Sequence, residues 1–164
     1  RSNLRRKIVS SWHCGSGAEI LYEDILDLIK EHTRNNGTIF IGTDSHVERQ
    51  QCIFSTAICF HGADGQTGGR YFFKKTKFEA LKFPTILERI TLEVEKSVKL
   101  SLSIYEQFPD SNIEIHLDIS SADKKEKTSS YADMLIGYAK GVGFTCKVKP
   151  EAFAASSIAD KHSK

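Results

Sequence analysis

The sequence predicts a single α/β domain on a mixed five-stranded sheet, with its elements in the order β-β-β-α-β-α-β-α and an added helix before the first strand. A chain of 164 residues with 40% hydrophobic and 27% charged residues is long enough and apolar enough to bury one core. Three consecutive β-rich runs followed by alternating helical and strand patterns predict a meander continued by parallel crossovers. We expect residues 1–17 to form an extension and residues 18–164 to form the domain.

The first half of the domain is predicted to be a helix followed by the meander. Residues 18–32 place apolar side chains at helical spacing with charges between them, and Gly37 closes the turn that follows. Three β-rich runs come next, at residues 38–43, 52–61 and 70–74, separated by turn-forming segments. Short links of this kind favour antiparallel neighbours.

The second half alternates helices and strands. One long amphipathic helix is predicted over residues 85–108, after a proline that suits a helix start. Residues 113–119 alternate apolar and polar side chains as a half-buried strand does. A helix over residues 130–140, a short strand over residues 144–149 and a last helix over residues 152–162 complete the predicted order.

Composition excludes several classes of protein. No apolar run approaches the roughly 20 residues needed to span a bilayer, so no membrane association is expected. The four cysteines lack C-x-x-C spacing and sit among apolar residues, which predicts reduced structural thiols and a cytoplasmic location. No signal-peptide pattern is present at the start of the sequence. The net charge of +2 gives no global basic field, so binding to a polyanion would depend on local patches.

Two aspartates are the candidates for chemistry. Asp44 follows the first predicted strand in the sequence IGTDSH, and Asp118 ends a later strand in HLDIS. Either one alone is typical of a turn or a helix cap. If the two strands are neighbours, however, the carboxylates converge and repel each other. A shared proton or a bound cation relieves such repulsion, and hard oxygen ligands favour Mg²⁺ or Mn²⁺.

Three motifs give the chain a family resemblance. They are IGTDSH at residues 41–46, HLDIS at residues 116–120 and ASSIADKHSK at residues 155–164. With these motifs in this order, the chain resembles the ribonuclease H-like YkuK family, and the resemblance implies a ribonuclease H-like fold. It is less specific for an activity, because ribonuclease H-like domains include nucleases, resolvases, transposases and inactive relatives.

The resemblance also implies a four-carboxylate metal site. Its members would be one Asp on the first strand, one Glu in the helix after the meander, one Asp on the fourth strand and one Asp in the last helix. Asp44, Asp118 and Asp160 match three of these positions, as catalytic and metal-binding residues. Glu93 is the first choice for the fourth, because it shares a helical stripe with small and apolar residues. Glu88, on a charged stripe, is the second choice.

Five further residues are candidates for contact with a substrate. Ser45 and His46 follow Asp44 directly, and His46 is expected either to touch a phosphate or a metal or to make hydrogen bonds within a loop. Lys124 and Lys127 lie in the polar segment after Asp118, where they meet a phosphate backbone or form a solvated surface. His162 is a candidate for moving protons, or a terminal histidine without a role.

Together these residues predict a metal-dependent nuclease that hydrolyses phosphodiester bonds of RNA, RNA/DNA hybrid or structured DNA. The alternative is a non-catalytic module that binds nucleic acid or protein and uses its carboxylates only for structural hydrogen bonds. Phosphotransfer on nucleotides has little support, because no glycine-rich phosphate loop follows the first strand. Nucleic acid is therefore the expected partner.

Overall fold

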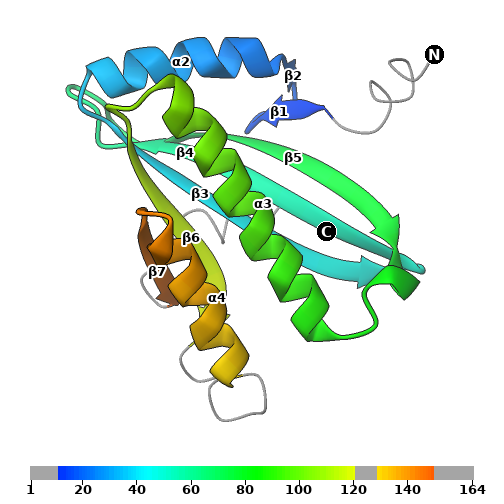
Figure 1. Cartoon of the computed structure of the whole chain (residues 1–164). Helices are drawn as coiled ribbons and strands as arrows, with labels where there is room; N and C mark the ends of the chain where they lie inside the picture. The colour runs from blue at the N-terminus through cyan, green and yellow to red at the C-terminus, as the bar shows by residue number, and fades with distance from the viewer. Residues whose placement is uncertain (1–10, 121–128, 150–164) are drawn as a thin grey trace.

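The computed structural model describes residues 11–120 and 129–149, and its helices stack on one face of a twisted sheet (Figure 1). The elements are, in chain order, β1 (Trp12–Cys14), β2 (Glu19–Ile20), α2 (Tyr22–Arg34), β3 (Thr38–Glu48), β4 (Gln51–His61), β5 (Arg70–Glu79), the 3₁₀ helix η1 (Ala80–Lys82), α3 (Ile86–Gln107), β6 (Asn112–Ser120), α4 (Ser129–Gly141) and β7 (Thr145–Lys149). Within these described residues the sheet has the strand order β2-β1-β5-β4-β3-β6-β7.

The central five strands agree with the predicted topology. Strands β3, β4 and β5 form an antiparallel meander, and β6 and β7 add parallel to β3 after the crossovers through α3 and α4. The sheet is larger than expected, because β1 pairs with the outer side of β5 and β2 pairs with β1. Residues 19–20 therefore form a strand, and the first helix begins at Tyr22 instead of residue 18.

Strands β3 and β6 continue past the points where the sequence predicted their ends. The β3–β4 ladder runs without interruption from Thr38 to the hairpin turn, so Asp44 pairs with Ser55 inside the sheet. Likewise β6 extends to Ser120, and Asp118 lies before its end, next to an irregularity in the pairing with β7. Polar residues remain extended here because each strand still pairs with one neighbour beyond the end of the β3–β6 ladder, β3 with β4 and β6 with β7.

The predicted helices of the second half agree closely with the structure. Helix α3 spans Ile86–Gln107, and the Thr85 hydroxyl accepts a hydrogen bond from the Glu88 amide in a capping box. Helix α4 and strand β7 lie within a few residues of their predicted bounds. The helix predicted over residues 152–162 lies outside the described residues.

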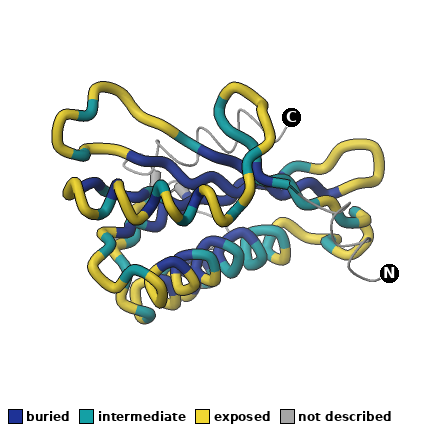
Figure 2. Tube along the Cα trace, turned by 90° about the horizontal axis from the view of Figure 1, so that it is seen from above, coloured by how far each residue is buried: buried dark blue, intermediate teal, exposed yellow. Residues whose placement is uncertain are grey.

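Two apolar clusters fill the space between the sheet and the helices, on a surface that we call the helix face. Under α2, Ile25 and Ile29 pack against Ile41 and Phe72, with Ile104 of α3 beside them. Under α3 and α4, the buried members are Val94, Val98, Ile115, Leu117, Ile119, Ala132, Leu135 and Ala139. Figure 2 shows the buried positions along the strands and on the inward sides of the helices. The alternating apolar residues of β6 thus hold α3 and α4 on the sheet.

The opposite side of the sheet, which we call the reverse face, has a smaller apolar group. Ala57 and Cys59 are buried there beside Phe40. The Phe40 ring also stacks on the His116 ring, with the ring centroids 4.6 Å apart. All four cysteines are free thiols, as the sequence predicted; Cys52 and Cys59 are buried, and Cys14 and Cys146 are partly exposed. Among the helices that the structure describes, none is both long and apolar enough to cross a bilayer.

A glycine fixes the junction between α2 and β3. The His32 ring leaves no space for a side chain at Gly37, because a Cβ atom at that position would overlap the ring atoms. The ring itself is held by a hydrogen bond of 2.9 Å between Nε2 and the Thr38 carbonyl and by stacking on Phe60 at 4.5 Å. This contact locks the end of the helix to the first strand of the meander.

We therefore expect Gly37→Ala to lower the melting temperature by about 3–10 °C, because the added methyl group must displace a fixed ring. Thermal unfolding followed by circular dichroism measures the change. Gly137→Ala is the matched control, since a Cβ at that position in α4 meets no atom within 4 Å. It should leave the melting temperature unchanged or raise it slightly. Equal stability of the two variants would contradict the proposed role of the His32 contact.

Candidate functional site

Asp44 and Asp118 lie side by side on the two central parallel strands. Strands β3 and β6 pair in parallel up to Gly42 and His116, and each aspartate comes two residues after its strand's member of that pair. The two carboxyl groups are joined by a hydrogen bond, which requires a proton on one of them. Asp44 is only 7% exposed. The structure thus brings these two predicted residues together on the reverse face.

The environment of Asp44 disfavours its ionised form. Burial, the hydrogen bond with Asp118 and the negative charges of Asp118 and Glu93 together raise the pKa of Asp44 to about 8, against a smaller opposing effect of the Ser45 backbone amide. At neutral pH the pair therefore retains a proton. A site that holds a proton between carboxylates is also one that a divalent cation can occupy in place of that proton.

Glu93 approaches the same strand from the helix face. It lies on the buried side of α3, and the Ser45 hydroxyl donates a hydrogen bond of 2.5 Å to its Oε2. The Arg89 side chain completes the network, with Nε 3.2 Å from Ser45 Oγ and Nη2 2.9 Å from the Ser45 carbonyl. Strand β3 and helix α3 are thereby joined by three polar groups beside the aspartate pair.

Burial dominates the electrostatics of Glu93. Desolvation and the negative charge of Asp118 raise the pKa of Glu93 to about 8, although the Ser45 hydroxyl and the Arg89 guanidinium favour the ionised form. The second-choice glutamate has a different setting. Glu88 is exposed at the start of α3, where its carboxylate accepts a bond from the Thr85 amide. Of the two, only Glu93 faces the sheet.

Strand geometry limits how closely the three carboxylates meet. Successive side chains of a strand point to opposite faces, so Asp44 points to the reverse face and Ser45, with Glu93, to the helix face. Over residues 11–120 and 129–149, no three potential metal-binding side chains converge around one point. Even so, buried carboxylate oxygens that repel one another suit a hard divalent cation, and Asp44 with Asp118 supplies the closest pair.

The other sequence candidates are placed as follows. His46 lies in β3 rather than in a loop; its two ring nitrogens are buried without a hydrogen bond, and Nε2 is 3.7 Å from a Glu48 carboxylate oxygen. Ser45 is buried, and its hydroxyl is engaged within the protein. Four candidates lie outside the described residues, and they are Lys124, Lys127, Asp160 and His162.

Arg89 was not singled out from the sequence. The available signal was its spacing of four residues from Glu93, which places the two side chains on one stripe of the helix. An arginine beside a buried glutamate is a common way to hold the carboxylate in one orientation. The network with Ser45, however, depends on how α3 crosses β3, which the spacing alone does not give.

The strand order, the crossover helix and the paired aspartates define a class of protein. The chain belongs to the ribonuclease H-like family, whose model matches residues 20–164. It is similar to the uncharacterized protein YkuK of Bacillus subtilis (strain 168), with 26% identity over 169 residues that cover 91% of this chain and 94% of that protein. No solved structure gives a significant match. Family membership points to a function related to nucleic acids.

The raised pKa values predict how stability depends on pH. Carboxyl groups of the unfolded chain titrate near pH 4, whereas Asp44 and Glu93 in the folded protein titrate near 8. Between these values the folded state binds more protons than the unfolded chain. The contribution of these two groups to the stability of the folded state is therefore complete below about pH 4 and is lost as the pH rises toward 8. Melting temperatures measured from pH 4.5 to 8.5 in EDTA should show this decline.

Asp44→Asn should flatten the same profile and raise the melting temperature at pH 8, because it removes one titrating carboxyl and its repulsion of Asp118. Asp110→Asn, at an exposed position in the turn after α3, should keep the wild-type profile. An unchanged slope in Asp44→Asn would contradict the assignment of the pH dependence to this pair.

Proposed function

We propose that this protein is a metal-dependent nuclease that hydrolyses phosphodiester bonds of RNA, RNA/DNA hybrid or structured DNA. The observation that carries the proposal is the hydrogen-bonded pair formed by the buried Asp44 and the partly buried Asp118 on adjacent parallel strands of a ribonuclease H-like chain. A buried carboxyl group whose pKa is raised as far as that of Asp44 is costly to the fold, and such groups cluster at functional sites.

The proposed site would hold Mg²⁺ or Mn²⁺ through Asp44 and Asp118, which share the reverse face of the sheet. Asp160, and Glu93, which bonds to Ser45 on the helix face, are the further ligands that the family resemblance implies. A divalent ion at such a site supplies positive charge to a phosphate and lowers the pKa of a water molecule. The protein's own contribution is to release the shared proton of the aspartate pair and to present both carboxylates on one face. Arg89 and Ser45 keep Glu93 ionisable and in one orientation.

One observation favours the alternative, a nucleic-acid or protein-binding module without catalysis. Each of the three described carboxylates has a hydrogen-bond partner inside the protein, since Asp44 bonds to Asp118 and Glu93 to Ser45. A site with this internal bonding is able to exist without metal. The two candidate functions therefore differ in whether a cation displaces the proton of the aspartate pair.

Metal binding is expected to raise the stability of the folded protein. A ligand at about 100 times its dissociation constant adds about 2.7 kcal/mol, which corresponds to an increase of about 5–10 °C in melting temperature for a chain of this size. Unfolding scans at pH 7.5 with and without millimolar Mn²⁺ measure it. Asp118→Asn should lose the increase, whereas the surface control Asp110→Asn should keep it. An equal increase in melting temperature in all three proteins would mean that Mn²⁺ binds at another site and would contradict the assignment of the metal to the aspartate pair.

The nuclease activity itself is tested with labelled RNA, RNA/DNA hybrid and DNA-junction substrates in Mg²⁺ or Mn²⁺. Wild type should cleave at least one of them, and Asp44→Asn should reduce the rate by at least about 100-fold without loss of folding, because it removes a ligand from the reaction centre. Should wild type bind Mn²⁺ and cleave none of the three, the catalytic proposal fails and the binding module becomes the better description.

A further inference from the structure

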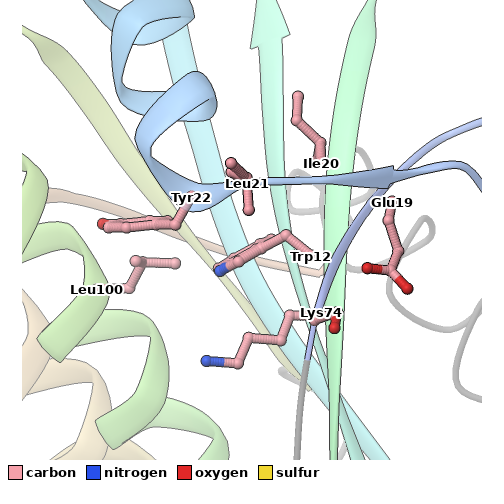
Figure 3. A pocket seen from close by; sticks show the side chains of 8 residues that line it. Trp12, Glu19, Ile20, Leu21, Tyr22, Lys74 and Leu100 are labelled. Atoms are coloured by element: carbon pink, nitrogen blue, oxygen red, sulfur yellow. The ribbon is translucent and has the colours of Figure 1, made fainter. Parts of the chain in front are cut away.

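A cavity of about 610 Å³ lies on the helix face, well away from the aspartate pair, where β1, β2, α2 and α3 meet (Figure 3). Its volume is within the range of small-molecule sites. Much of its wall is apolar and aromatic. Trp12 and Tyr22 stack on each other with ring centroids 5.9 Å apart, and Ile20 and Leu100 flank them. Such a wall suits a flat ring system such as a nucleobase.

Positive charge gathers at one end of this cavity. Lys74 of β5 lines the cavity, and its ammonium lies 5.8 Å from the centre of the Trp12 ring. Lys96 of α3, one turn before Leu100, is close enough for repulsion by Lys74 and by Lys99. These three lysines, which we call the lysine cluster, come from a strand and a helix that are far apart in sequence.

The lysine cluster is not neutralised within the described part of the chain. No ion pair there includes Lys74, Lys96 or Lys99. The ammonium groups of two of them lie over aromatic rings instead, with Lys96 5.6 Å from the centre of Phe78. Burial and the charges of Lys74 and Lys99 lower the pKa of Lys96. A bound anion would relieve this repulsion.

One carboxylate also lines the cavity, but on its other side. Figure 3 shows the Lys74 ammonium directed toward Leu100 and α3, while the Glu19 carboxylate lies at the other end of the cavity, away from Leu100. An anionic group placed between Lys74 and Lys96 therefore lies at the end of the cavity away from the Glu19 carboxylate. The cavity thus has an anion-attracting end and an apolar body.

We propose that this cavity binds a nucleotide bearing a phosphate, with its base against Tyr22 and Leu100 and its phosphate between Lys74 and Lys96. The nucleotide is either free or the phosphorylated end of a nucleic-acid strand, since both present the same chemistry. This binding needs no metal and is separate from the proposed hydrolysis at Asp44, which lies on the reverse face of the sheet.

The chain provides its own reporter for the test. Trp12 is the single tryptophan and lines the cavity, so its emission should change on occupancy. Titrations in EDTA use adenosine 5′-monophosphate, adenosine and inorganic phosphate, then a hexanucleotide with and without a terminal phosphate. Adenosine 5′-monophosphate should give a saturable change at lower concentration than adenosine or phosphate alone. Binding of the phosphorylated hexanucleotide but not of the mononucleotide would identify a strand end as the ligand.

Lysine variants test the phosphate contact by calorimetry with the ligand that binds. Lys74→Gln and Lys96→Gln should each weaken binding about ten-fold, because each removes one charge-assisted contact. Lys30→Gln, on the exposed side of α2, should bind as wild type does. Asp44→Asn should also bind normally, which separates this proposal from the nuclease proposal. The absence of any saturable signal at millimolar ligand, or normal binding by Lys74→Gln, would overturn it.

Discussion

The parallel pairing of β3 with β6 is the constraint on which the rest of the molecule depends. It sets the register that carries Asp44 and Asp118 to the same level of the sheet, two residues beyond Gly42 and His116. A parallel pair requires a crossover, and α3 supplies it while Val94 and Val98 pack on β6 and Ser97 bonds to Thr43 of β3. The apolar contact that closes the core therefore also fixes the distance between two carboxyl groups that repel each other.

The alternation of side chains along β3 explains why the polar site is divided between two faces. Asp44 and Ser45 are adjacent in sequence and point in opposite directions, so a helix on one face reaches the strand only through Ser45. Glu93 and Arg89 meet there, and the electrostatic effect of Glu93 on Asp44 passes through the strand. Both carboxyl groups are buried, which raises both pKa values and links the site's charge to the stability of the whole domain.

The sequence was most informative where its periodicity was long. The 22 residues of α3 repeat apolar positions over six turns, and the stripe that holds Glu93 was identifiable from them. Strand ends were harder to predict, because residues such as Asp44 and Ser45 are typical of turns but remain extended here through their pairing with β4. Strands β1 and β2 are too short to show an alternation, and only the free edge of β5 explains why they form.

The two proposed sites lie back to back, and their spacing has a consequence for substrates. Lys74 faces the cavity, whereas the next residue, Lys75, is on the reverse face in register with Ser55, which in turn pairs with Asp44. Beyond Lys74, no described strand pairs with the outer side of β5. Neighbouring strands are about 4.8 Å apart, so the aspartate pair lies about 10 Å from this edge. A nucleic acid whose phosphorylated end is held by Lys74 and Lys96 would thus have to pass around the edge of β5, along Lys75 and Lys77, to reach Asp44. The scissile bond would then be a few nucleotides from the bound end, and a free mononucleotide in the cavity would compete with binding without being hydrolysed.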